Sequence, residues 1–134
     1  MKDRADLVRG LLRKAASDRL SMEATLKVGA FDGACFHAQQ AAEKYLKAFL
    51  TYHAASFPFT HNLAELTELC AAVDAEFRSL KSRAAPLTTY AVRLRYDDLL
   101  WPSREETDEA RSVVSEVERM VLSRLPREIA ETIS

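Results

Sequence analysis

The stretch FHAQQAAEKYLKAFL, residues 36–50, decides the fold of this 134-residue chain. Its apolar residues recur at spacings of three and four, which is the period of an amphipathic helix. We therefore predict a helix over 32–54. The residues expected to face the core are Cys35, Ala38, Ala42, Tyr45 and Phe49.

The rest of the chain is also predicted to be helical, because no segment sustains the period-two alternation of a strand. Further helices are expected over 3–27, 62–73, 75–95 and 104–125. The apolar register of segment 75–95 continues across Pro86, so we expect either one kinked helix or two nearly coaxial helices there.

The ends of these helices carry recognisable capping residues. Asp3 is the expected N-cap of the first helix, and Gly29 follows its C-terminus. Ser103 and Glu106 form a capping box before the last helix, which Pro126 ends. The core face of the first helix is expected to contain Leu7, Leu11, Ala15, Met22 and Leu26.

Residues 1–134 together predict one all-α domain, an up-and-down antiparallel bundle of four or five helices. Apolar residues make up 48% of the chain and charged residues 29%, enough for a core and a hydrated surface. No run approaches the ~18 apolar residues of a membrane span, so no membrane association is expected. The charged N-terminal residues do not resemble a signal peptide, and we expect a cytoplasmic protein.

Several function classes are excluded by composition and spacing. The net charge is -1, so the chain has no general attraction for DNA, and no DNA binding is expected. The three glycines do not cluster as a phosphate-binding loop requires. The three histidines lack metal-ligand spacing, and we expect neither a metal nor a cofactor. Cys35 and Cys70 lie on apolar stripes, which favours buried free thiols.

Two polar clusters are candidates for function. On the helix over 32–54, polar residues from Gln40 to Lys47 occupy neighbouring turns. They are either a solvated face, whose Glu43–Lys47 ion pair contributes ~0.3–0.5 kcal/mol, or the wall of a ligand groove. The segment 93–98, RLRYDD, either forms a structural Arg–Asp clasp, which we slightly favour, or recognises phosphate and stacks on a base.

Three segments in this order resemble the HEPN domain family (higher eukaryotes and prokaryotes nucleotide-binding), in its stand-alone prokaryotic type. They are 36–50 with its AQQAAEK motif, 59–63 with THNL, and 95–98 with RYDD, and the resemblance spans about 31–120. It implies a bundle of four or five helices that forms a homodimer. Prokaryotic members are often encoded beside a minimal nucleotidyltransferase, and some of these pairs are toxin–antitoxin modules.

The resemblance also implies a polar groove at the dimer contact that binds a nucleotide or a similar ligand. We expect two copies to bury the alanine-lined flank of the helix over 32–54 against each other. The polar residues around the groove would be Gln40, Glu43, Lys44, Lys47, His61, Arg95, Tyr96 and Asp98.

One departure from the family bears on catalysis. HEPN ribonucleases carry an Arg followed four to six residues later by a His at the start of the last helix. In this chain the last histidine is His61, so the pair is absent and no catalytic residue is assigned. The leading hypothesis is a non-catalytic, ligand-binding homodimer with a nucleotidyltransferase partner. The alternatives are a divergent ribonuclease toxin, using Arg95 with His61 or Tyr96, and a structural dimeric adaptor.

Overall fold

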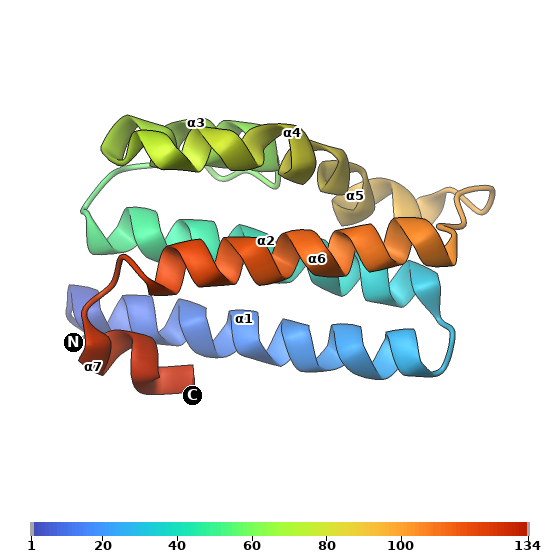
Figure 1. Ribbon diagram of the computed structural model, residues 1–134, viewed down its shortest axis with the longest axis horizontal. Helices are drawn as coiled ribbons and strands as arrows, with labels where there is room; N and C mark the ends of the chain where they lie inside the picture. Colours follow the sequence, from blue (N-terminus) through green and yellow to red (C-terminus); the bar gives the residue numbers. More distant parts are fainter. Residues whose placement is uncertain (1, 134) are drawn as a thin grey trace.

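The computed structural model describes residues 2–133 except the side chain of Arg95, and these residues form an all-α bundle (Figure 1). Three long helices are completed by a fourth layer of shorter segments. The elements in chain order are α1 (Arg4–Lys27), α2 (Phe31–Tyr52), α3 (Leu63–Val73), the 3-10 helix η1 (Ala75–Leu80), α4 (Lys81–Ala84), η2 (Ala85–Thr88), α5 (Thr89–Tyr96), α6 (Arg104–Leu122), α7 (Arg127–Ala130) and η3 (Glu131–Ile133).

Helix α2 is the centre of the bundle, because it packs against α1, α6, α3 and α5. The predicted core residues of this helix, from Cys35 to Phe49, are all buried. Phe49 stacks on Phe77 of η1 with 4.5 Å between ring centroids. The alanines of α2 are buried within the chain as well. The expectation that two copies bury this alanine-lined flank against each other is therefore wrong, since neighbouring helices of the same chain already cover it.

The predicted up-and-down bundle is confirmed, and the predicted caps are present. α1, α2, the segment from η1 to α5, and α6 alternate in direction (Figure 1). Asp3 and Asp6 form a capping box at the start of α1, and Ser103 and Glu106 form another at the start of α6. Reciprocal side-chain-to-backbone bonds satisfy amide groups that the first helical turn leaves unpaired.

The core face of α1 lies one residue away from the prediction. Leu7 is 49% exposed, whereas Val8 and Leu12 are fully buried against the rest of the core. Both registers share Ala15 and Met22, so the spacing alone fits either stripe. The side of α1 that is covered is decided mainly by the position of α2, with smaller contacts from α7 and η3.

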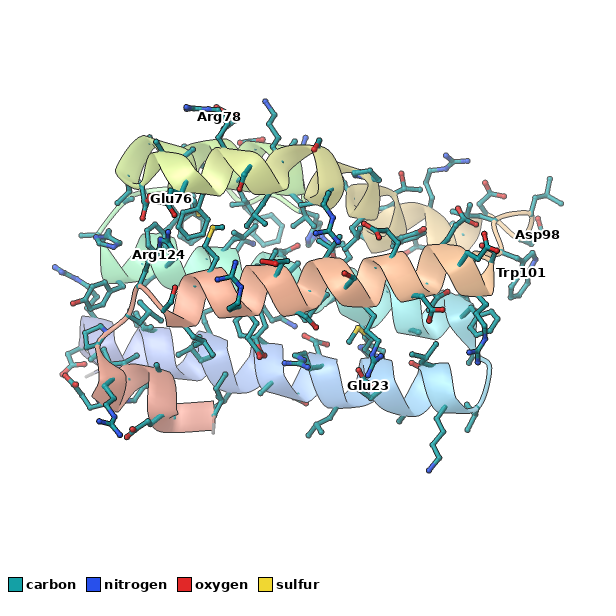
Figure 2. All side chains as sticks on the ribbon, in the orientation of Figure 1. Glu23, Glu76, Arg78, Asp98, Trp101 and Arg124 are labelled. Carbon is teal, nitrogen blue, oxygen red and sulfur yellow. The ribbon has the colours of Figure 1, made fainter. Side chains whose placement is uncertain are left out.

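The segment over 75–96 follows a kinked path, as the position of Pro86 predicts. It is a succession of short helices, yet its apolar residues from Phe77 to Ala91 keep one buried register. Arg124, just after α6, binds the start of this segment. Its Nε lies 2.6 Å from Asp74, and its guanidinium carbon lies 5.5 Å from the centre of the Phe77 ring. Figure 2 shows Arg124 beside Glu76 of η1, with which it also forms an ion pair.

Helix α3 is an exception to the alternation, because it runs parallel to α2. The side chain of Gln39 contacts the backbone of His61, and Cys70 of α3 contacts the backbone of Leu46. Residues further along α2 therefore contact residues further along the segment 61–70, so the two helices run in the same direction. The connection 53–62 returns along α2 to make this possible, and it places His61 beside the middle of that helix.

Both cysteines are buried free thiols, as predicted. Burial raises the pKa of Cys70 to about 12. No helix of the described residues combines the length and apolar character that crossing a bilayer would require. The chain continues beyond Pro126 as α7 and η3, which pack on α1 and which the sequence pattern did not predict.

Candidate functional site

Helix α2 has one side that other helices cover only in part. The partly exposed residues on this side step along α2 by three, four, three and four positions, so they form a single stripe. We call His37, Gln40, Lys44, Lys47 and Thr51 the α2 stripe. The predicted polar face is thus real, but its side chains divide between two separate clusters.

The first cluster is built around Glu43, which is only 5% exposed at the edge of the stripe. Its Oε1 lies 2.7 Å from Nδ1 of His61 and accepts a 3.1 Å hydrogen bond from Gln39. Its Oε2 lies 3.0 Å from Nζ of Lys47. Gln40 donates a 2.7 Å hydrogen bond to Gln39 and extends the network to the stripe. We call these five residues the Glu43 cluster.

Hydrogen bonding keeps the Glu43 carboxyl ionised. Burial alone would raise its pKa, but hydrogen bonds from His61, Lys47 and Gln39 outweigh burial and hold the pKa below its usual value. Glu43 is therefore a fixed anion that positions a histidine and a lysine at the protein surface.

Aromatic side chains border the Glu43 cluster. Nζ of Lys47 lies 5.8 Å from the centre of the Phe57 ring and 5.7 Å from the centre of the Phe59 ring. Phe59 also meets His61 edge to face, with 5.7 Å between ring centroids, yet is 94% exposed. A cation, an imidazole and an open aromatic face thus lie together, which suits a ligand that has both charge and a planar ring.

The second cluster is formed with α1. His37 Nδ1 lies 3.1 Å from Asp18, and Lys44 forms an ion pair with the same carboxylate. Lys44 therefore faces away from the Glu43 cluster. The reason is helical geometry: consecutive residues such as Glu43 and Lys44 point about 100° apart around the helix axis.

The other predicted site residues lie at the end of the bundle where α5 leads to α6. Tyr96 and Asp98 line a hollow of about 220 Å³ together with Asp32 of α2. Figure 2 shows Asp98 projecting at this end. Asp32 precedes Glu43 by eleven residues, which corresponds to about 16 Å along the helix. The side chain of Arg95 lies outside the described residues.

The Arg–Asp clasp that the sequence suggested forms between Arg93 and Asp97, at 3.0 Å. The backbone N–H of Leu99 and the Arg93 guanidinium both donate to this carboxylate and lower the pKa of Asp97. The clasp closes the turn after α5.

Sequence reasoning did not assign Asp18, Gln39, Phe57 or Phe59 to the site. A signal existed for Asp18, because it interrupts the apolar stripe of α1. Gln39 likewise stands inside an apolar run and is fully buried. Among residues 2–133, no three His, Cys, Asp or Glu side chains gather closely enough to hold a metal ion.

Comparison with known families gives a match to the HEPN domain over residues 8–125. This range includes all three motif segments and far more than half of the chain. No curated protein and no solved structure matches the chain.

Proposed function

The chain belongs to the HEPN domain family, and from this we propose that it is a non-catalytic homodimer that binds a nucleotide or a similar polar ligand. We further propose that it pairs with a minimal nucleotidyltransferase in a toxin–antitoxin-type module. The observation that carries the proposal is the juxtaposition of the α2 stripe, the Glu43 cluster and exposed aromatic side chains.

Exposed apolar side chains beside α2 support self-association. Phe59 borders the middle of α2, and Tyr96, which is 80% exposed, borders its beginning. Large apolar groups that are exposed commonly mark an interaction surface. A two-fold contact across the α2 stripe would cover them in both copies, since such a contact uses the same surface twice.

The chemistry of the Glu43 cluster supports an anionic, ring-containing ligand. Glu43 engages Nδ1 of His61 and one of the three N–H donors of Lys47, which leaves two N–H donors of Lys47 for a phosphate. The open face of Phe59 can stack on a base. Binding would therefore combine charge-assisted hydrogen bonds with stacking.

Calorimetric titration with ATP and GTP tests the ligand, and light scattering tests the dimer. We expect a dimeric mass and saturable heat. Lys47→Ala should weaken binding at least about tenfold, the effect of losing one charge-assisted hydrogen bond. Lys81→Ala is the matched control, because Lys81 pairs with Glu68 away from the stripe. Absence of heat at millimolar nucleotide, or equal affinities of the two variants, would remove the ligand from the proposal.

A ribonuclease is the second candidate, and one observation favours it. A carboxylate bonded to one nitrogen of a histidine, as Glu43 is to His61, is the arrangement that orients a catalytic general base. The test is incubation of total RNA with wild-type protein, His61→Asn and Arg95→Ala. Cleavage that both substitutions abolish would establish the ribonuclease.

A structural dimeric adaptor is the third reading of the same surface. It predicts that Lys44→Ala and Lys47→Ala alter dimer stability but that no nucleotide binds. A dimer that gives no heat with any nucleotide would favour this adaptor.

A further inference from the structure

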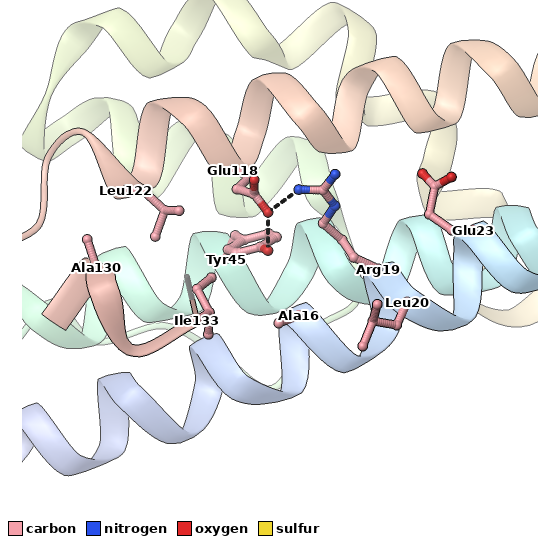
Figure 3. Close-up of a pocket in the computed structure, with 9 residues that line it drawn as sticks. All are labelled: Ala16, Arg19, Leu20, Glu23, Tyr45, Glu118, Leu122, Ala130 and Ile133. Atoms are coloured by element: carbon pink, nitrogen blue, oxygen red, sulfur yellow. Dashed lines mark hydrogen bonds and ion pairs between the residues drawn. The ribbon is translucent and has the colours of Figure 1, made fainter.

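A separate hollow lies between α1, α6 and the C-terminal segment, and it shares no residue with the α2 stripe (Figure 3). Its volume is about 370 Å³, near the lower end of the ~300–1,000 Å³ typical of small-molecule sites. Two charged residues, Arg19 and Glu118, and the phenol of Tyr45 face it on one side. Its apolar walls are Ala16, Leu20, Leu122, Ala130 and Ile133.

The polar side of the hollow is a triad centred on Glu118. Figure 3 shows Arg19 and Tyr45 converging on this carboxylate from α1 and α2. Tyr45 is fully buried, and burial together with the neighbouring carboxylate raises the pKa of its hydroxyl. The hydroxyl is therefore a hydrogen-bond donor at neutral pH, and the triad carries one positive and one negative charge.

The triad keeps unused hydrogen-bonding capacity. Arg19 and Tyr45 both contact Oε2 of Glu118, so Oε1 can still accept a hydrogen bond. The guanidinium of Arg19 has five N–H donors, more than Glu118 and Tyr45 use. The polar side of the hollow thus offers a hydrogen-bond acceptor on Glu118 beside hydrogen-bond donors on Arg19.

The charge of the remaining acidic residue at the rim of the hollow is also balanced by an arginine. Glu23 lines the hollow, but its carboxylate is bound at 2.6 Å by Arg111 of α6. A charged ligand would therefore bring an uncompensated charge into a partly buried site, which is unfavourable. A carboxylate would be opposed by Glu118, and an ammonium group would be opposed by Arg19.

We propose that this hollow binds a small uncharged molecule that carries an amide group on an apolar body. The amide oxygen accepts from Arg19, and the amide N–H donates to Oε1 of Glu118. The apolar body contacts the leucine and isoleucine side chains of the walls. This site is independent of the function proposed for the α2 stripe.

Three probes with one ring and different head groups test the proposal: benzamide, benzoate and benzylamine. Each is titrated into the ¹⁵N-labelled full chain, and amide chemical shifts are followed. We expect saturable shifts with benzamide around Ala16, Leu20 and Ile133. Dissociation constants for benzoate and benzylamine should be at least about tenfold higher. The benzoate carboxylate would be repelled by Glu118, and the benzylamine ammonium group would be repelled by Arg19.

Two variants that fill the hollow locate the binding. Ala16→Leu adds volume at the wall while keeping a strong helix former. Leu20→Trp adds volume at the mouth of the hollow. The native side chain there is 73% exposed, so a larger side chain should not disturb the fold. Each should weaken benzamide binding at least about tenfold. Ala72→Leu, on the exposed side of α3, is the control and should bind as wild type does.

Three results would overturn the proposal. The first is the lack of saturation by benzamide up to about 10 mM, beyond which a ligand of this size is not specific. The second is equal affinity for the three head groups. The third is unchanged benzamide binding in a folded Leu20→Trp variant.

Discussion

At Glu43, three hydrogen-bond donors offset the cost of burying a charge. An unpaired buried carboxylate would cost several kcal/mol, but His61, Lys47 and Gln39 all contact this one. Gln39 and Lys47 belong to α2, whereas His61 belongs to the connection 53–62. The carboxylate therefore ties the connection to α2 and sets the position of the histidine.

Replacing Glu43 with glutamine should make the stability of the protein less dependent on pH. The pKa of Glu43 is lower in the folded chain than its usual value of 4.5. The carboxylate therefore stabilises the fold above pH 4.5, and this contribution is lost as pH falls through the lowered pKa. Urea unfolding should show Glu43→Gln less stable than wild type by about 1–3 kcal/mol at pH 7, with the difference shrinking toward pH 3.

Glu128→Gln is the matched control for this measurement. Glu128 is an exposed residue of α7, so its substitution should change the free energy of unfolding by less than about 0.5 kcal/mol at either pH. A pH-independent difference between wild type and Glu43→Gln would show that packing, and not ionisation, is responsible.

Two glycines, Gly10 within α1 and Gly29 just after its C-terminal end, should respond in opposite ways to substitution by alanine. Gly29 ends the helix with φ at +79°, a conformation that side-chain-bearing residues rarely adopt, and its N–H donates to Leu26. Gly10 lies in the helix interior, and a Cβ there would meet nothing within 4 Å. Gly29→Ala should therefore destabilise the fold by about 1 kcal/mol, and Gly10→Ala should stabilise it by about 0.5–1 kcal/mol.

Thermal unfolding of the two variants measures this contrast directly. The melting temperature of Gly10→Ala should rise and that of Gly29→Ala should fall relative to wild type. Equal shifts in one direction would mean that the backbone conformation at Gly29 does not carry the expected strain.

The helices themselves could be predicted from periodicity and caps, but their mutual arrangement could not. The predicted helix over 104–125 and the observed α6 agree because the signals, a capping box and a 3.6-residue stripe, are local. The side of α1 that is buried depends on where α2 lies, which no local signal contains. The return of segment 53–62 along α2 is likewise set by contacts between residues distant in sequence, such as Gln39 and His61.

The same limit applies to the candidate site. The spacing of Gln40, Glu43 and Lys47 correctly placed them on one side of α2. It did not show that Glu43 is buried, because burial comes from the returning connection. Nor did the spacing show that Lys44 forms an ion pair with Asp18 of α1, since that contact joins residues far apart in sequence.

For the whole molecule, the decisive test is whether the surface around the α2 stripe joins two copies. Phe59 is the most exposed large apolar side chain of the described residues, and truncating it removes no core contact. Leu20 is also highly exposed but lies on α1 beside the separate hollow. Phe59→Ala should raise the dimer dissociation constant at least about tenfold, as truncation of an aromatic anchor does, while Leu20→Ala should leave it unchanged.

Sedimentation velocity over a concentration series measures both constants, and chemical unfolding checks that each variant is as stable as wild type. Both substitutions remove apolar area from highly exposed side chains, although Phe59→Ala removes more of it. A general loss of surface hydrophobicity would therefore weaken self-association in both variants. An interface that includes Phe59 but not Leu20 predicts that Phe59→Ala alone weakens the dimer. Wild-type protein that remains monomeric at every concentration, or equal weakening by both variants, would place the interface elsewhere or exclude the dimer.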